Sequence, residues 1–188
     1  FMQLNFPGTK PFLLSFLLFY LLFFQSIQAQ SELKPSAKFT FDAKNESDLV
    51  SNSKIKMHGY NYCDDRFGNP NHAIYLFGNE YSYLNLGNYA ALKPQEGSIS
   101  LWVKIQVPVA TGSGYDANPI LLTKRTNEND FFEAYGIYLD LENKMIVASS
   151  AKDSMEQVRL FSKNKISLSE WHHVVLVYNN NFMTLYLD

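Results

Sequence analysis

Side chains capable of chemistry are few along this chain, and they follow no recognised catalytic or metal-binding spacing. The one cysteine, Cys63, and the four histidines are too scattered for a zinc site. Gly112-Ser113-Gly114 lacks the Gly-x-Ser-x-Gly pattern of a nucleophile elbow, and no phosphate-binding Gly-Lys-Ser/Thr loop is present. Adjacent strand residues face opposite sides, so His172 and His173 cannot bind one ion together. We expect one imidazole to be hydrogen-bonded beneath its sheet, the other to be exposed, and neither to be catalytic.

The charge and the cysteine content limit the ligands and the disulfide bonds that this chain can have. Lysine and arginine total 16 and aspartate and glutamate 18, a formal net charge of -2. The longest basic block is Lys124-Arg125, so we expect no nucleic-acid ligand. Because Cys63 is alone, no disulfide can form within these residues.

The N-terminal residues 1–29 have the composition of a secretory signal peptide. An apolar run from Phe12 to Phe24 follows Lys10 and leads to the small residue Ala29, after which we expect cleavage. The run is shorter than the ~20 residues that span a membrane, although an uncleaved signal anchor is the alternative. We therefore predict an exported protein, extracellular, cell-surface or periplasmic, with no membrane span after cleavage. Residues 30–36 form a short polar leader.

The elements that must position any site are β-strands. Short runs of strand-forming residues alternate with clusters of Gly, Pro, Asn and Asp, and no segment has a sustained helical repeat, which indicates a sandwich or barrel. The predicted strands are Lys38–Asp42, Ala73–Phe77, Ser82–Leu86, Ser98–Val107, Ile120–Lys124, Tyr135–Leu141, Met145–Ser149, Gln157–Phe161, His172–Tyr178 and Phe182–Leu187. The long segments 43–72 and 108–119 are predicted to be loops, where binding residues often lie.

Two strand patterns are especially clear. In the segment 98–105, one face carries Ile99, Leu101, Val103 and Ile105, and the other carries Ser100, Trp102 and Lys104. In the segment 171–188, Val174, Leu176 and Tyr178 share a face, and Asn179-Asn180-Asn181 reverses the chain into a second strand. That strand ends at Asp188 with an unpaired edge, so we expect an incomplete domain.

The order of several motifs resembles the laminin-G-like, concanavalin A-like jelly-roll family. The motifs are the run Asp65-Arg66-Phe67-Gly68 with Ala73, then Phe77-Gly78-Asn79, Tyr83-Leu84-Asn85-Leu86, Ser98-Ile99-Ser100-Leu101-Trp102-Val103, Trp171-His172-His173-Val174-Val175 and Leu185-Tyr186-Leu187-Asp188. The resemblance implies an all-β, two-sheet antiparallel jelly-roll sandwich over residues 37–188, with its closing strands missing. Trp102 and Trp171 are then expected to pack in the core, with sugar stacking as the alternative.

The fold of this family also houses retaining β-glucanases, whose strand motif E-x-D-x-E supplies nucleophile and acid/base. The nearest match here is Tyr138-Leu139-Asp140-Leu141-Glu142. Tyr138 occupies the nucleophile position, so the two-step mechanism fails, and Asp140 is better interpreted as leading into the turn Glu142-Asn143-Lys144. We therefore predict that this chain is not an enzyme.

The resemblance also implies a calcium ligand at Asp42, just after the first predicted strand. Asp64 and Asp65 form an alternative acidic pair, and solvated loop carboxylates are the alternative to a metal site in both cases. Together these features predict an exported binding module for carbohydrate or an extracellular protein surface, assisted by calcium. The aromatic residues that we expect at its ligand are Tyr81, Tyr83, Tyr115 and Tyr135. The alternatives are a sensor domain of a membrane receptor such as a histidine kinase, a recognition appendage of a secreted glycoside hydrolase, and a structural adhesion module.

Overall fold

The computed structural model describes residues 34–106, 119–125, 133–151, 157–179 and 181–188. The chain divides into two compact units, Phe1–Pro35 and Ser36–Asp188, and the fold below is that of the second. The predicted signal peptide (residues 1–29) and Tyr115 lie outside the described residues. No helix in the described ranges is long and apolar enough to cross a membrane.

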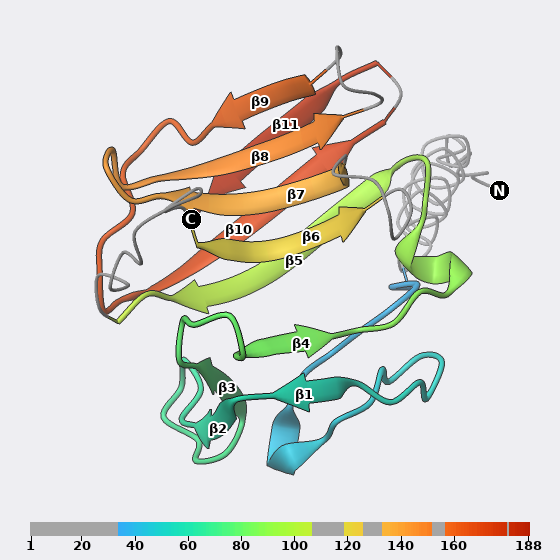
Figure 1. Cartoon of the computed structure of the whole chain (residues 1–188), viewed down its shortest axis with the longest axis vertical. Coiled ribbons are helices and arrows are strands. Elements are labelled where there is room, and N and C mark those ends of the chain that lie inside the picture. The colour runs from blue at the N-terminus through green and yellow to red at the C-terminus, as the bar shows by residue number, and fades with distance from the viewer. Residues whose placement is uncertain (1–33, 107–118, 126–132, 152–156, 180) are drawn as a thin grey trace, which may run out of the picture. The chain divides into compact units, whose positions relative to one another are not determined.

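Two antiparallel sheets form the body of this unit (Figure 1). One has the strand order β11-β10-β5, built from β5 (Gly97–Lys104), β10 (Trp171–Tyr178) and β11 (Met183–Leu187). The other has the order β6-β7-β8-β9, built from β6 (Ile120–Arg125), β7 (Glu133–Asp140), β8 (Met145–Ala151) and β9 (Gln157–Phe161). The predicted all-β, two-sheet antiparallel sandwich is confirmed.

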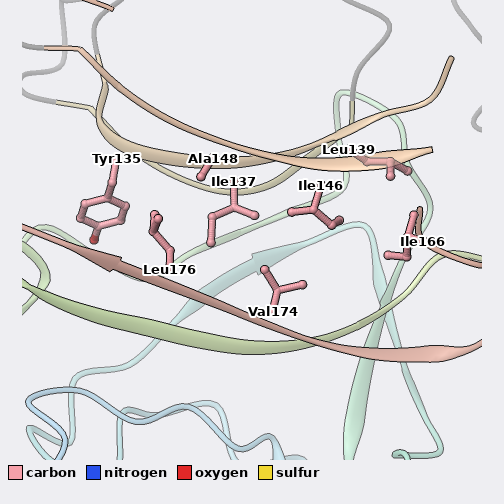
Figure 2. Packing of buried hydrophobic residues seen from close by; sticks show 8 residues of the cluster. All are labelled: Tyr135, Ile137, Leu139, Ile146, Ala148, Ile166, Val174 and Leu176. Atoms are coloured by element: carbon pink, nitrogen blue, oxygen red, sulfur yellow. The ribbon is translucent and has the colours of Figure 1, made fainter. Parts of the chain in front are cut away.

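The hydrophobic core lies between the two sheets (Figure 2). β7 and β8 contribute Ile137, Leu139 and Ile146, and β10 contributes Val174 and Leu176, all of which are at most 1% exposed. Full burial of such a side chain contributes about 1.5–3 kcal/mol. Partly buried side chains of β5 and the residue after it pack against this cluster as predicted, namely Ile99, Leu101, Val103 and Ile105.

Strand alternation also places Trp102, and it places this side chain outside the core. Since Leu101 and Val103 face inward, Trp102 faces outward and is 43% exposed. The expectation that Trp102 packs in the core is therefore wrong. Trp171 alternates with the buried His172 and lies half-buried on the same outer face.

Two further ladders were not predicted in full. β1 (Lys56–His58) pairs with β4 (Tyr83–Asn85), and β2 (Tyr60–Cys63) pairs with β3 (Ala73–Leu76). β1 and β2 fall in the segment 43–72, so the prediction of one long loop there is wrong. These strands have only three and four residues, Lys56-Met57-His58 and Tyr60-Asn61-Tyr62-Cys63, which are too few to show a clear apolar alternation.

The strand predicted at Lys38–Asp42 is also absent. Phe41 has a left-handed backbone with φ of 59°, and a short 3-10 helix, η1 (Asp42–Lys44), follows it. The backbone N–H of Lys38 donates to the Asp48 side chain, and its carbonyl accepts from the N–H of Leu49. These hydrogen bonds tie Lys38 to Asp48 and Leu49, and the described residues 38–41 join no sheet ladder.

A buried carboxylate, Asp48, organises the segment before β1. Its side chain is 0% exposed. It accepts hydrogen bonds from the backbone N–H groups of Lys38, Val50 and Ser51 at 2.7, 3.0 and 3.2 Å, and from the hydroxyls of Ser51 and Tyr89 at 2.6 and 2.8 Å. Burial alone raises the pKa of Asp48, but these hydrogen bonds outweigh burial and hold the pKa well below its ordinary value.

The hairpin between β10 and β11 forms where it was predicted. Asn179 Oδ1 accepts hydrogen bonds from the backbone N–H groups of Asn181 and Phe182, at 2.8 and 3.0 Å. The side chain thus supplies an acceptor for backbone N–H groups that the turn leaves without one, which is why asparagine suits the position.

Candidate binding site

The outer face of the β11-β10-β5 sheet carries an exposed group of aromatic and basic side chains. Cross-strand pairing places Trp102 beside His173, Lys104 beside Trp171, and Ser100 and Tyr186 on either side of Val175. A loop residue pair, Arg66 and Phe67, reaches the same group. We call this surface the Trp102 face, and it comprises Arg66, Phe67, Ser100, Trp102, Lys104, Trp171, His173, Val175 and Tyr186.

Trp102 and His173 form the centre of the Trp102 face. Their rings are stacked, with centroids 4.7 Å apart and planes 13° from parallel. The hydroxyl of Ser100 lies 2.8 Å from His173 Nε2. These two contacts fix the orientation of the imidazole, so that the surface is preformed on rigid strands.

Two cations lie against aromatic rings of the face. The Cζ atom of Arg66 is 4.4 Å from the Trp102 centroid and 4.3 Å from the Phe67 centroid. Lys104 Nζ is 5.9 Å from the Trp171 centroid. Each contact is within cation–π range. Phe67 and Tyr186 are 72% and 57% exposed, so both rings are available to a ligand.

A loop that is hydrogen-bonded within itself presents Arg66 and Phe67. Asp65 Oδ1 accepts from the backbone N–H groups of Phe67 and Asn69 at 2.8 and 2.9 Å, and Oδ2 accepts from Asn69 Nδ2 at 3.0 Å. Gly68 closes the turn with φ of +84°, a conformation that favours glycine. Desolvation raises the pKa of Asp65, but hydrogen bonds from Asn69 and Phe67 outweigh it and leave the pKa below its ordinary value.

Of the four tyrosines predicted at the ligand, the structure describes three, and it leaves Tyr81 and Tyr83 exposed and buries Tyr135. Tyr81 is 72% exposed in the loop before β4, and Tyr83 is 47% exposed and stacked on His58 with ring centroids 4.7 Å apart. Tyr135 is 7% exposed within the core cluster, and its hydroxyl donates to the Leu92 carbonyl at 2.9 Å. Burial raises the pKa of Tyr135 to about 12. A ring in this position is not available for stacking on a ligand, and Tyr115 lies outside the described residues.

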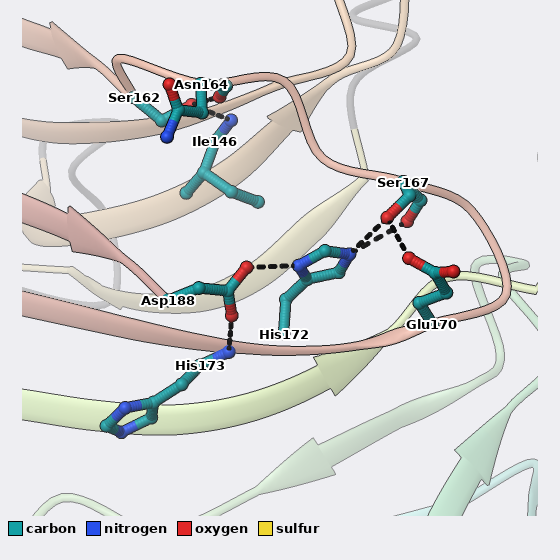
Figure 3. Close-up of polar contacts among 8 residues, drawn as sticks. All are labelled: Ile146, Ser162, Asn164, Ser167, Glu170, His172, His173 and Asp188. Atoms are coloured by element: carbon teal, nitrogen blue, oxygen red, sulfur yellow. Dashed lines mark hydrogen bonds and ion pairs between the residues drawn. The ribbon is translucent and has the colours of Figure 1, made fainter.

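The two adjacent histidines face opposite sides of the sheet, as predicted. His172 is 7% exposed, whereas His173 lies on the Trp102 face. His172 Nδ1 is 2.6 Å from Asp188 Oδ2, and Nε2 is 3.0 Å from Ser167 Oγ (Figure 3). The hydrogen bond to His172 is the first cause that lowers the pKa of Asp188.

This serine, histidine and aspartate set resembles a catalytic triad only in its side-chain types. The Ser167 hydroxyl donates to Glu170, and His172 Nε2 also lies 3.2 Å from the Ser167 carbonyl oxygen. A nucleophilic serine has to donate to its histidine. We interpret the set as a connection that joins the loop before β10 to the strand and to Asp188.

The carboxylates considered for calcium are either exposed or already engaged in hydrogen bonds. Asp42 is exposed at the start of η1, and a calcium site there remains a prediction. Asp65 uses its oxygens within its own loop, as described above. Among the described residues, no three or more His, Cys, Asp or Glu side chains gather as a metal-binding group. Asp140 accepts from Asn143 at 2.8 Å and 3.1 Å, which confirms its predicted place at a turn.

Comparison with known proteins agrees with the architecture. A model of the concanavalin A-like lectin/glucanases superfamily, of the laminin G type, matches residues 77–188. The chain is also similar to a Paraclostridium bifermentans protein named non-toxic nonhemagglutinin, with 27% identity over 143 residues, which make up 74% of this chain and 11% of that protein. The chain thus spans a small part of that relative. No solved structure matches the chain. The superfamily model covers more than half of the sequence, and the chain therefore belongs to the concanavalin A-like lectin/glucanase superfamily.

Proposed function

We propose that this domain is an exported, non-catalytic module that binds saccharides on the Trp102 face. The observation that carries the proposal is the exposed Trp102 ring at the centre of a rigid sheet surface, flanked by exposed aromatic rings and hydrogen-bond donors. Membership in a superfamily named for lectins and glucanases supports binding of carbohydrate or protein. Tyr138 in place of the glucanase nucleophile supports binding over catalysis.

The chemistry of the Trp102 face suits a sugar better than an apolar partner. Aromatic rings cover the apolar C–H faces of a sugar, while Ser100, His173 and the basic side chains supply polar groups between the rings. Tyr186 lies two strand spacings across and two residues along from Trp102. At about 4.8 Å per strand and about 3.4 Å per residue, their Cα atoms are about 12 Å apart. This span suits an extended oligosaccharide.

The experiment that tests the proposal is a glycan array followed by calorimetric titration of the best saccharide. Trp102→Ala is expected to weaken binding by about tenfold or more, since the variant loses the indole contact with the sugar and the ring against which Arg66 and His173 are held, at a cost on the order of 1.4 kcal/mol. Phe161→Ala is the matched control, because Phe161 is an aromatic residue of comparable exposure, 51%, on the other sheet. Equal affinities for the wild type and Trp102→Ala would remove the Trp102 face from the proposal.

We propose separately that calcium assists saccharide binding. A calcium site at Asp42 would make saccharide binding sensitive to a chelator, and Asp42→Ala would reproduce the effect. Binding that is unchanged by EDTA and by Asp42→Ala would show that the module works without calcium. The predicted sensor and hydrolase-appendage roles remain predictions.

A further inference from the structure

We infer that Arg66 binds an anionic substituent of the saccharide, either a uronate carboxylate or a sulfate ester. The inference rests on the proposed function of the Trp102 face and specifies the chemical class of its ligand.

Arg66 is held by aromatic rings and not by an acidic partner. Its guanidinium lies over Trp102 and Phe67, and within the described part of the chain the one salt bridge joins His172 to Asp188. No hydrogen bond from the Arg66 guanidinium is found to a described residue. The neighbouring carboxylate, Asp65, accepts three hydrogen bonds within its own loop. Among the described residues, the donors of Arg66 therefore have no partner, and the side chain is already positioned.

The mode of contact decides where these donors point. A guanidinium is planar, and all five of its N–H groups lie in that plane. A guanidinium that lies flat on a ring keeps its edge open, and this edge is the fork that binds a carboxylate or a sulfate through two parallel hydrogen bonds. Because the rings hold the side chain before binding, less conformational entropy is lost when the ligand arrives.

The surrounding charges also favour an anion. Lys104, a second cation, lies on the same face, over Trp171. The Asp188 carboxylate is directed to other partners, because Oδ1 accepts from the backbone N–H of His173 and Oδ2 contacts the ring of His172. Arg66 and Lys104 thus present two positive charges to an approaching ligand, which strengthens recognition of an acidic saccharide at low salt.

The test uses saccharide pairs that differ only in charge. For the carboxylate arm, an oligogalacturonate is compared with its methyl ester, and for the sulfate arm, dextran sulfate is compared with dextran. Binding is measured by calorimetry at two salt concentrations for the wild type, Arg66→Lys, Arg66→Ala and the control Arg159→Ala, which removes an exposed arginine of β9.

The expected result is tighter binding of the charged member in at least one arm. Arg66→Ala should weaken that binding by about tenfold or more while changing affinity for the neutral member less than about twofold. The affinity of Arg66→Lys for the charged member should lie between those of the wild type and Arg66→Ala, since lysine keeps the charge and loses the fork. The arm with the larger effect identifies the anionic group.

Two results overturn the inference and are distinguishable. Binding of neutral saccharides that depends on Trp102 but not on Arg66 would overturn the role of Arg66 and leave the proposed function standing. No binding to any member of either pair, with none on the glycan array, would overturn the proposed function as well. Because Arg66 is exposed, we expect its variants to melt at the wild-type temperature, and this measurement checks that they are folded.

Discussion

Replacing the buried carboxylate Asp48 should destabilise the domain strongly. Asp48→Ala leaves the N–H groups of Lys38, Val50 and Ser51 and two hydroxyls without their acceptor. A hydrogen bond to a charged group contributes about 1.5–3 kcal/mol. Lys38, Val50 and Ser51 are exposed residues, so water can replace part of what is lost. We therefore expect a loss of about 3–5 kcal/mol, well below the sum of the individual bonds.

Two milder variants separate the contributions within this network. Asp48→Asn keeps Oδ1 for Lys38 and Val50 but places an amide against the N–H of Ser51, and we expect a loss of about 2 kcal/mol. Tyr89→Phe removes one donor and should cost about 1–2 kcal/mol. Urea unfolding followed by tryptophan fluorescence measures these free energies. A loss below about 1 kcal/mol for Asp48→Ala would refute the reasoning.

The pH dependence supplies an independent check on Asp48. Its folded pKa lies below its unfolded value of about 3.9. Ionised Asp48 therefore contributes stability that is fully present above the unfolded pKa and is lost as the pH falls through the folded pKa. The stability difference between the wild type and Asp48→Asn should be constant near neutral pH and should narrow below about pH 4. A difference that grows on acidification would contradict this assignment.

Further substitutions test other parts of the fold and the site. Gly59→Ala should cost about 1–3 kcal/mol, measured by urea unfolding, because φ is +53° and a Cβ atom would lie 2.6 Å from the Tyr81 carbonyl oxygen. Ser162→Ala should cost about 1–3 kcal/mol, because the buried hydroxyl accepts from the Ile146 N–H at 3.1 Å; an unchanged midpoint would contradict this. Asp65→Ala should weaken binding of the acidic saccharide by releasing the loop that carries Arg66, and Asp65→Asn, which keeps Oδ1, should restore much of it. Equal affinities for the two variants would argue against a positioning role.

The sequence predicted the elements that have strong local patterns. In β5, strict alternation of apolar and polar residues determines which side chains reach the core, and the structure follows it. The β10-β11 hairpin is marked by Asn179, whose side chain caps the turn. Both signals act between residues that are close in sequence.

Residue type predicts less than position in two strands. The aromatic character of Trp102 favours the core, but its place between Leu101 and Val103 puts it on the outer face. The prediction of Tyr135 at the ligand overlooks that it shares a buried strand face with Ile137 and Leu139. In both strands, the alternation of side chains predicts the face on which each residue lies.

Other features depend on contacts that a single sequence does not reveal. Arg66 and Trp102 belong to a loop and a strand that are far apart in the chain, and the guanidinium reaches the ring only after the loop and the sheet have formed. Asp48 is one of many carboxylates, and nothing in its neighbours marks it as the buried acceptor for Tyr89. Such long-range pairs require the fold itself.

The most direct test of the central claim uses Trp102 as its own reporter. The chain contains two tryptophans, so Trp171→Phe leaves Trp102 as the single source of indole fluorescence. Titration with the saccharide selected on the array should shift the emission of Trp102 and protect the indole from quenching by acrylamide, with a midpoint equal to the calorimetric Kd of the same Trp171→Phe variant. Saccharide binding that leaves the emission and the accessibility of Trp102 unchanged would contradict the claim that the Trp102 face is the binding site.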